Sequence, residues 1–324
     1  MKKVSVDQVG GPEQLKIVEA PKPVPGPKDA VVKVAYSGVN FIDVYFRTGL
    51  YKADMPVTLG SEAAGTVDSV GADVTELAPG DRVAYAMVRG SYAEYAVVPV
   101  AQLVKIPERV DLATAAAVML QGMTAHYLTH STFPLAAGHT CLVHAAAGGT
   151  GGLVVQMAKH RGARVFGTVS TEQKAQEVRS LGADEVINYT THDFEAEVKR
   201  LTDGRGVDVI YDSVGKTTFE KGLNAIRPRG MMALFGQSSG SVSPIDPAIL
   251  NQKGSLFLSR PSLGHHILTR DEILWRVGDL MNYISSGIVS VRIGGEYALS
   301  DVAQAHRDLE GRKTTGKLLL RVGS

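Results

Sequence analysis

The sequence predicts an α/β protein of two domains, in which a mostly antiparallel, barrel-like β domain is joined to a doubly wound parallel sheet. Its 324 residues exceed the usual size of a single domain. Residues 1–122 contain short apolar runs separated by glycine and proline turns, as in antiparallel sheets. From Thr140 onward, strand-like runs alternate with helix-like runs, which is typical of a parallel sheet covered by helices.

The predicted β domain begins with strands and ends with a helix. Apolar runs bounded by turn residues predict strands at 4–9, 15–19, 30–36, 65–70, 82–86 and 92–99. The proline-rich segment 21–27 predicts an extended surface loop. Alanine, leucine and methionine at helical spacing predict a helix over 113–129, where the chain leaves this domain.

The second domain is predicted from six strands, at 140–145, 164–168, 185–188, 207–211, 231–235 and 255–259. Between the second and third, a helix over 172–182 is closed by Gly182. Beyond Pro261 we expect a helix over 270–286, a strand over 289–296, a helix over 302–310 and a strand over 317–322. These last elements are expected to return to the first domain. The predicted domains are therefore 1–122 with 262–324, and 123–261.

A glycine-rich turn connects the strand 140–145 to the helix-like segment 153–160. Against the G-x-G-x-x-G template, Ala146 stands at the first glycine, Gly148 at the second and Gly151 at the third. Small residues let the backbone approach a phosphate, and the positive end of the following helix stabilises an anion. Such a turn can also be purely structural, but its strand-helix-strand context favours a dinucleotide pyrophosphate site.

The end of the second strand of this sheet favours NADPH over NADH. NAD-binding folds usually carry Asp or Glu about 20 residues beyond the glycines, where it binds the ribose 2′-hydroxyl. Here Ser170 can donate to a 2′-phosphate and Lys174 can supply its countercharge. Lys174 could instead be a solvated helix lysine, and Glu172 nearby weakens the cationic argument.

Composition excludes several other functions. The 34 basic residues nearly balance 33 acidic ones and no basic tract occurs, so nucleic acid is not an expected partner. No apolar run approaches the roughly 20 residues that span a bilayer, and the first residues lack the apolar core of a secretory signal. We therefore expect a cytoplasmic protein without membrane contact. The single cysteine, Cys141, is expected to be a buried, inert thiol.

Motifs along nearly the whole chain resemble those of the medium-chain dehydrogenase/reductases, and most closely the zinc-independent NADPH:quinone oxidoreductase family, to which zeta-crystallin belongs. The segments that carry this resemblance are 38–43, 60–65, 79–83, 145–149 and 212–215, with Tyr45, Tyr51 and 260–262. The resemblance implies a GroES-like β-barrel catalytic domain, a Rossmann domain that binds NADPH, and a homodimer.

Zinc-dependent relatives bind their metal through a cysteine where this chain has Asn40 and a histidine where it has Ser61. Glu62 alone cannot hold zinc, which needs about three protein ligands. His126 and His130 lie one helical turn apart, but the sequence offers them no third ligand. Without a Lewis acid, an already electrophilic acceptor such as a quinone is expected to take hydride directly from the nicotinamide, with no flavin.

By resemblance, the acceptor lies in a cleft lined by Asn40, Asp43, Tyr45, Tyr51 and Arg260. Asn40 and the tyrosine hydroxyls can donate to a quinone oxygen, and the tyrosine rings can stack on a flat acceptor. Tyr45 and Tyr51 could instead only pack a wall, and Arg260 could instead bind a nucleotide phosphate. Asp43 is expected to orient neighbours rather than act as a base, because the hydroquinone is completed by protons from water.

The resemblance assigns further residues to the cofactor. Expected at the pyrophosphate are Gly148, Gly149, Thr150 and Gly151; at the adenosine phosphate Ser170, Lys174 and Tyr189; and near the nicotinamide or ribose Thr124 and Tyr127. Ser213, Phe235, Gly236, Gln237 and Ser238 follow predicted strands, at the edge where such sheets bind ligands. His265 and His266 are expected in a surface loop, and Trp275 is expected to anchor a helix.

Three functions remain open from the sequence alone. The leading hypothesis is NADPH-dependent quinone reduction. A 2-alkenal or enone reductase would use the same hydride and much the same pocket. The third is a crystallin-like or RNA-interacting NADPH-binding protein with little turnover, against which the near-neutral charge counts.

Overall fold

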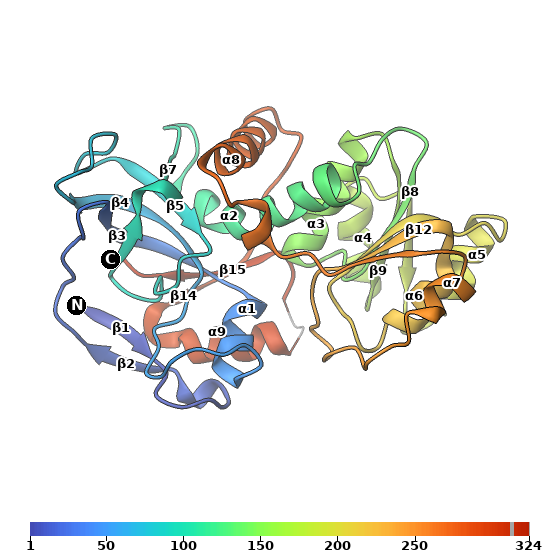
Figure 1. Ribbon diagram of the computed structural model, residues 1–324, viewed down its shortest axis with the longest axis horizontal. Coiled ribbons are helices and arrows are strands. Elements are labelled where there is room, and N and C mark those ends of the chain that lie inside the picture. The colour runs from blue at the N-terminus through green and yellow to red at the C-terminus, as the bar shows by residue number, and fades with distance from the viewer. Residues whose placement is uncertain (312–313, 324) are drawn as a thin grey trace. The chain divides into compact units, whose positions relative to one another are not determined.

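The computed structural model of the protein describes residues 1–311 and 314–323 (Figure 1). It divides into two compact units, the first comprising residues 1–123, 267–286 and 291–324 and the second residues 124–266 and 287–290. The chain passes between the units after residues 123 and 266, whereas the sequence predicted these boundaries after residues 122 and 261. The sequence did not predict that residues 287–290 would join the second unit.

The first unit is built on an almost entirely antiparallel sheet. Its strands follow the order β14 (Ile293–Ala298), β15 (Lys317–Arg321), β3 (Asp29–Val39), β4 (Glu62–Val70), β5 (Arg82–Ala86) and β7 (Val104–Lys105), with β6 (Tyr95–Pro99) paired to β3. Only β14 and β15 are parallel. Its buried face packs Val32, Val67, Val83, Val98 and Leu103 together. Because β3 is the longest strand and pairs with three others, the residues at its end are held firmly in place.

Smaller elements complete the first unit. β1 (Lys2–Ser5) and β2 (Lys16–Glu19) form a separate two-stranded sheet. The helices are α1 (Phe41–Thr48), α8 (Arg270–Ser285) and α9 (Val302–Glu310), and α2 (Leu112–Tyr127) starts in this unit and ends in the second. Within the described residues, no helix is long and apolar enough to cross a membrane.

The second unit is the predicted doubly wound sheet. Six parallel strands run in the order β10 (Glu185–Asn188), β9 (Arg164–Val169), β8 (Thr140–Val143), β11 (Val207–Asp212), β12 (Ile226–Leu234) and β13 (Phe257–Ser259). The helices that connect them are α3 (Gly149–His160), α4 (Glu172–Ser180), α5 (Phe194–Leu201), α6 (Phe219–Ala225) and α7 (Ala248–Gln252). If the six strands are numbered along the chain, their order across the sheet is 3-2-1-4-5-6. The order reverses at β8, and such sheets bind dinucleotides at this point.

Several predicted boundaries are wrong for identifiable reasons. The strand expected at 140–145 ends at Val143, because Ala145 turns with a φ of 51°. The strand expected at 289–296 begins only at Ile293, because Ser290 exchanges two hydrogen bonds of 2.8 and 3.1 Å with the Gln156 side chain. The strand expected at 4–9 occupies Lys2–Ser5, and Val9 is exposed.

Candidate active site

The glycine-rich turn is as tight as the sequence predicts. Gly148 precedes the first residue of α3 and has no side chain to cap the helix, so the amide groups at its start are left for another acceptor. A Cβ on Gly151 would overlap the carbonyl of Ala145 and lie 3.0 Å from the Cα of Ala146. Ala146, at the first template position, is fully buried and tolerates its methyl group. The turn therefore fits a phosphate held by backbone N–H groups.

Ser170, Lys174 and Tyr189 lie around the ends of two neighbouring strands. Ser170 follows β9, Tyr189 follows β10, and the Tyr189 amide donates to the Val169 carbonyl over 3.0 Å. Lys174 stands in the first turn of α4, where its amide donates to the Thr171 side chain. Glu172, which weakened the case for a cationic site, forms a 2.6 Å ion pair with Arg179.

Asp212, to which sequence reasoning gave no role, organises the loop that carries Ser213. Its fully buried carboxylate accepts from the amides of Val214 and Gly215, at 2.7 and 3.1 Å, and from the Thr218 hydroxyl at 2.7 Å. The available signal was an acid at the end of a predicted strand, three residues before Gly215, and the structure gives this glycine a φ of 87°.

The segment 235–238 closes onto the Ser213 loop. The Phe235 amide donates to the Asp212 carbonyl over 2.8 Å, and the Ser238 amide donates to the Ser213 carbonyl over 3.1 Å. A Cβ on Gly236 would lie 2.7 Å from that Ser213 carbonyl, so only glycine fits there. Ser213 and all four expected residues of 235–238, including Gln237, thus lie at the carboxyl edge of the sheet.

The remaining second-unit residues are placed less uniformly. Arg260 is exposed and directly follows β13, so it lies at the same carboxyl edge as Ser213 and the segment 235–238. Thr124 and Tyr127 are buried in α2. The Tyr127 ring stacks on His266, with centroids 4.2 Å apart, which corrects the expectation that His266 is a surface-loop residue. The exposed His265 is consistent with that expectation.

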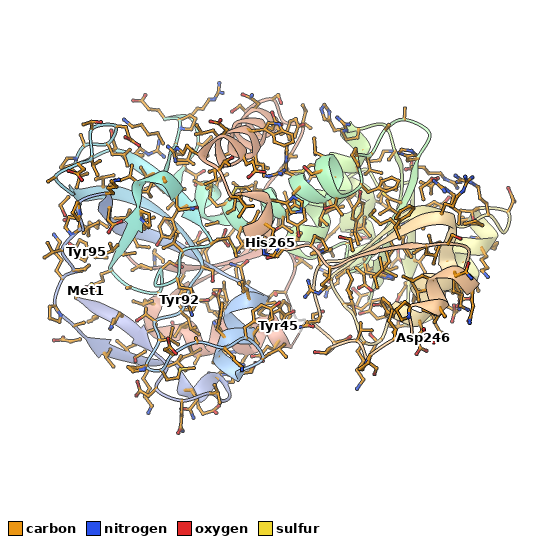
Figure 2. The ribbon with its side chains drawn as sticks, viewed as in Figure 1. Met1, Tyr45, Tyr92, Tyr95, Asp246 and His265 are labelled. Atoms are coloured by element: carbon orange, nitrogen blue, oxygen red, sulfur yellow. The ribbon has the colours of Figure 1, made fainter. Side chains whose placement is uncertain are left out.

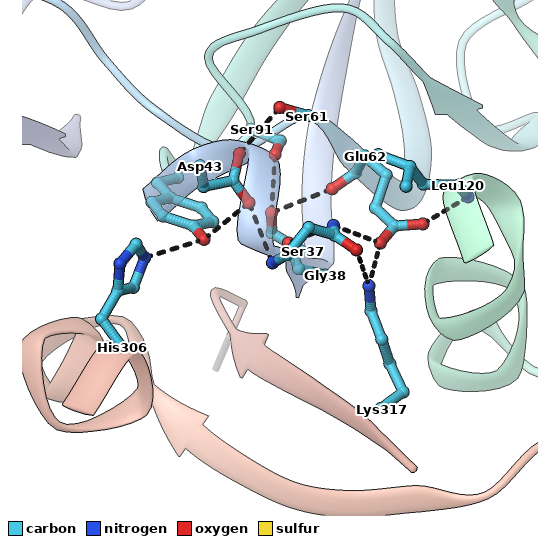
Figure 3. Close-up of polar contacts among 11 residues, drawn as sticks. Ser37, Gly38, Asp43, Ser61, Glu62, Ser91, Leu120, His306 and Lys317 are labelled. Atoms are coloured by element: carbon cyan, nitrogen blue, oxygen red, sulfur yellow. Dashed lines mark hydrogen bonds and ion pairs between the residues drawn. The ribbon is translucent and has the colours of Figure 1, made fainter. Parts of the chain in front are cut away.

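In the first unit, Asp43 is buried at the centre of a polar cluster (Figure 3). Its carboxylate accepts from the Ser61 hydroxyl at 2.7 Å, the Asn40 amide at 3.0 Å and the Tyr92 hydroxyl at 3.1 Å. Burial raises the pKa of Asp43 to about 6, although these donors and the charge of Lys317 pull it down. Both carboxylate oxygens accept from donors inside the protein, which suits an orienting role better than that of a base.

Beside Asp43, a buried ion pair joins Lys317 to Glu62. The Lys317 ammonium also donates to Asn40 Oδ1 over 2.7 Å, and Asn40 Nδ2 donates to Glu62 Oε1 over 2.7 Å and to the Gly38 carbonyl over 3.4 Å. The amide protons of Asn40 are thus already donated within the protein. Sequence reasoning missed Lys317, because a lysine at the end of a strand is usually exposed and the sequence carries no signal that this one is buried.

Tyr45 of α1, which is labelled in Figure 2, forms an aromatic cluster with Tyr51. Their rings meet edge to face with centroids 5.2 Å apart, and Phe46 contacts Tyr51 at 5.7 Å. Both tyrosines are half-buried. This arrangement leaves ring surface for a flat acceptor and equally provides wall packing, so both expectations for these residues stay predictions.

The other singled-out residues have structural surroundings. His126 and His130 stack with centroids 4.0 Å apart, and His130 Nδ1 meets the Thr129 hydroxyl at 2.9 Å. Among residues 1–311 and 314–323, no group of three or more His, Cys, Asp or Glu side chains is placed to hold a metal ion. Cys141 is buried, which raises the pKa of its thiol. Trp275, expected to anchor a helix, is 47% exposed and lies beside the Arg276 guanidinium.

An antiparallel GroES-like sheet together with a doubly wound nucleotide-binding sheet defines the class of medium-chain dehydrogenases and reductases. Residues 26–108 match the alcohol dehydrogenase GroES-like domain and residues 149–268 match the zinc-binding dehydrogenase domain.

Full-length relatives narrow this class to a family. The chain is 42% identical to a quinone oxidoreductase of Pseudomonas aeruginosa, over 98% of this chain and 99% of the relative. It is 40% identical to a 2-haloacrylate reductase of a Burkholderia species, over 97% of each chain. The crystal structure of Escherichia coli quinone oxidoreductase complexed with NADPH matches with a TM-score of 0.98 and 40% identity, over 99% of this chain and 100% of that one. The protein belongs to the quinone oxidoreductase family, which confirms the resemblance seen in its sequence.

Proposed function

We propose that the protein reduces quinones with NADPH, with the second unit binding the cofactor and the first contributing residues that hold the acceptor. The observation that carries this proposal is the end of β9, where Ser170 and Lys174 stand in place of the acid typical of NAD-binding folds. The similarity to a quinone oxidoreductase that was crystallised with NADPH supports the same cofactor and substrate class.

On the cofactor side, the position of most of the proposed residues at the carboxyl edge of the parallel sheet supports these contacts. The backbone of Gly148, Gly149, Thr150 and Gly151 binds the pyrophosphate, and Ser170, Lys174 and Tyr189 bind the 2′-phosphate. The loops at Ser213 and 235–238, together with Thr124 and Tyr127, line the nicotinamide half. Arg260 directly follows β13, the last strand of this parallel sheet, so we assign it to the same edge as a contact to a phosphate or the ribose.

On the acceptor side, the residues of the first unit orient the acceptor and stack against its flat ring. When bound, NADPH supplies the hydride. The rings of Tyr45 and Tyr51 stack on the flat acceptor, and the Tyr51 side chain is held beside α1 because its amide donates to the Tyr45 carbonyl. Asp43 and Asn40 hold the start of α1 in place. The hydride and one proton together complete the hydroquinone, and that proton comes from water, so no buried acid has to supply it.

A second candidate function is reduction of an alkene conjugated to a carbonyl. The observation that favours it is the 2-haloacrylate reductase among the full-length relatives. An activated alkene can accept hydride in the same position as a quinone, so the fold alone does not separate the two.

One experiment decides between these functions. The purified, metal-chelated protein is assayed for oxidation of NADPH and NADH with 1,4-benzoquinone, 9,10-phenanthrenequinone, a 2-alkenal and 2-chloroacrylate in parallel. Quinone-dependent loss of NADPH supports the leading proposal, and preference for an alkenal or a haloacrylate supports the second. Tight NADPH binding without turnover of any acceptor would overturn both.

We further propose that the protein is a cytoplasmic homodimer. Among the strands that the structure describes, β13 pairs with β12 alone and lies at the edge of the sheet, and its Phe257 and Leu258 side chains are 59% and 36% exposed. A free, apolar strand edge can extend its sheet into a second copy of the chain, which would cover these side chains.

A further inference from the structure

Lys317 places a buried positive charge at the start of a strand whose middle residues are apolar. It opens β15, whose next three residues are leucines, and its side chain is 1% exposed. A buried ammonium is costly unless its protons are donated to good acceptors. Here the acceptors are Glu62 Oε1 and Asn40 Oδ1, which come from β4 and from the residue that precedes α1.

Glu62 is satisfied on both oxygens. Oε1 accepts from Lys317 and from Asn40 Nδ2, and Oε2 accepts from the Leu120 amide of α2 over 2.6 Å. The carboxylate occupies space that a side chain at position 38 would fill, since a Cβ on Gly38 would overlap Glu62 Oε1 and lie 2.7 Å from its Cγ. The pair is therefore a built, close-packed centre and not an incidental surface contact (Figure 3).

This centre determines which way the Asn40 side chain faces. The lysine ammonium can only donate, so it must meet the Asn40 oxygen, whereas the Glu62 carboxylate accepts and must meet the Asn40 nitrogen. The oxygen and nitrogen of an amide can otherwise exchange places with little change of shape. Glu62 and the Gly38 carbonyl accept from Nδ2, and the Lys317 ammonium donates to Oδ1, so the ammonium holds the oxygen end of an amide whose nitrogen end these acceptors hold.

We propose that Lys317 is a positioning residue of the reduction site: its ammonium, balanced by Glu62, locks the Asn40 amide and through it the start of α1, which carries Asp43 and Tyr45. This inference rests on the proposed function for the site to which it is assigned. Asn40 connects the two parts, because its backbone N–H donates to Asp43 while its side chain meets Lys317. Small losses of alignment at a reacting centre lower the rate far more than they lower stability.

The test uses the charge-balanced double variant Lys317→Met/Glu62→Gln in the full-length protein. Lys317→Met alone leaves a buried unpaired carboxylate and is expected to lower the melting temperature by roughly 5–15 °C. The double variant removes both charges and is expected to recover most of that loss. Its kcat/KM for the quinone should still be lower by about tenfold or more, with the Kd for NADPH unchanged.

The variant Asn40→Ala tests whether Lys317 acts through the Asn40 side chain. Added to the double variant, it should lower kcat/KM little further, because the two changes remove the same alignment. The surface variant Lys105→Met, which breaks the exposed pair with Asp81, is the matched control and should behave as wild type. A double variant with wild-type kcat/KM, or an Asn40→Ala effect that simply adds, would overturn the inference.

A readout independent of turnover keeps this inference separate from the proposed function. The side-chain amide protons of Asn40 should exchange slowly with solvent in the wild type, seen as sharp, protected NMR resonances, and quickly in the double variant. A wild type that reduces no acceptor would overturn the proposed function alone. Equal protection of Asn40 in both proteins would overturn the role of Lys317.

Discussion

Tyr92 donates its hydroxyl to Asp43 Oδ2 over 3.1 Å, and both side chains are fully buried. His306 Nε2 lies 3.2 Å from the same hydroxyl, while its Nδ1 faces Arg47 at 3.0 Å. Because the guanidinium can only donate, His306 must be neutral with its proton on Nε2. Donors thus point in one direction, from Arg47 through His306 and Tyr92 to the Asp43 carboxylate.

This chain of hydrogen bonds predicts an unusual pH dependence of stability. The pKa of Asp43 rises on folding from 3.8 to about 6, so the folded state binds more protons between these values. Its contribution to the free energy of unfolding is fully present below pH 3.8 and is lost as the pH rises through 6, by about 3 kcal/mol. Burial lowers the pKa of His306 from 6.5 to about 3, so its contribution is present above 6.5 and is lost as the pH falls.

The two contributions oppose each other in the wild type, and Asp43→Asn separates them. The free energy of unfolding of the variant should rise more steeply between pH 4 and 7 than that of the wild type, because only the His306 contribution remains. Urea unfolding at each pH measures this. Parallel profiles for the two proteins would show that Asp43 does not titrate in this range.

Lys174→Ala is expected to raise the KM for NADPH by about tenfold or more and to leave the KM for NADH nearly unchanged. A charge-assisted hydrogen bond to a 2′-phosphate is worth about 1.5–3 kcal/mol, and NADH lacks that phosphate. Steady-state kinetics with both cofactors measure the effect. Lys199→Ala, on the surface helix α5, is the matched control. Equal changes in the KM values for NADPH and NADH would contradict a role of Lys174 in binding the 2′-phosphate.

Gly151→Ala should abolish measurable NADPH binding, because its methyl group would overlap the Ala145 carbonyl and force the turn open. Titration of NADPH fluorescence measures the loss. The control is Gly278→Ala in α8, where a Cβ would meet no atom within 4 Å, and which should stabilise the protein by about 1 kcal/mol. Unimpaired NADPH binding by the Gly151 variant would contradict a pyrophosphate site at this turn.

Asp212→Ala should weaken NADPH binding by about tenfold and lower stability by about 2–3 kcal/mol, since it leaves two backbone amides and the Thr218 hydroxyl without their acceptor. Asp212→Asn should be much milder. Its oxygen can still accept from both amides, and Thr218 can donate instead to the Gly215 carbonyl, 3.1 Å away. Calorimetric Kd values for the two variants test this order, and equally damaging substitutions would contradict it.

Phe257→Lys is expected to convert a dimer into a monomer, because a charge on the exposed edge strand β13 opposes burial against a second copy. Sedimentation at micromolar concentration measures the change. Leu274→Lys introduces the same charge at another exposed apolar side chain, on α8, and should leave the dimer intact. A monomeric wild type would refute the proposed dimer altogether.

Local patterns were enough to predict which segments of the second unit form its strands. All six of its strands and the glycine-rich turn were predicted, since apolar runs and turn residues act over a few neighbouring positions. The predicted end of an element was wrong where a residue distant in the sequence determines it. Ser290 does not join the strand expected at 289–296, because its backbone N–H and C=O both form hydrogen bonds with the side chain of Gln156, which is far away in sequence.

The sequence by itself determined the family and the doubly wound sheet, and it predicted NADPH as the cofactor, because these depend on short motifs and on residues at strand ends. Only the tertiary structure decided what surrounds Asp43 and Asn40. Lys317 is separated from Asn40 by most of the chain, and the pairing of β15 with β3 brings the two together. The cost of burying a charge makes such a contact specific, but that cost depends on packing that no local pattern records.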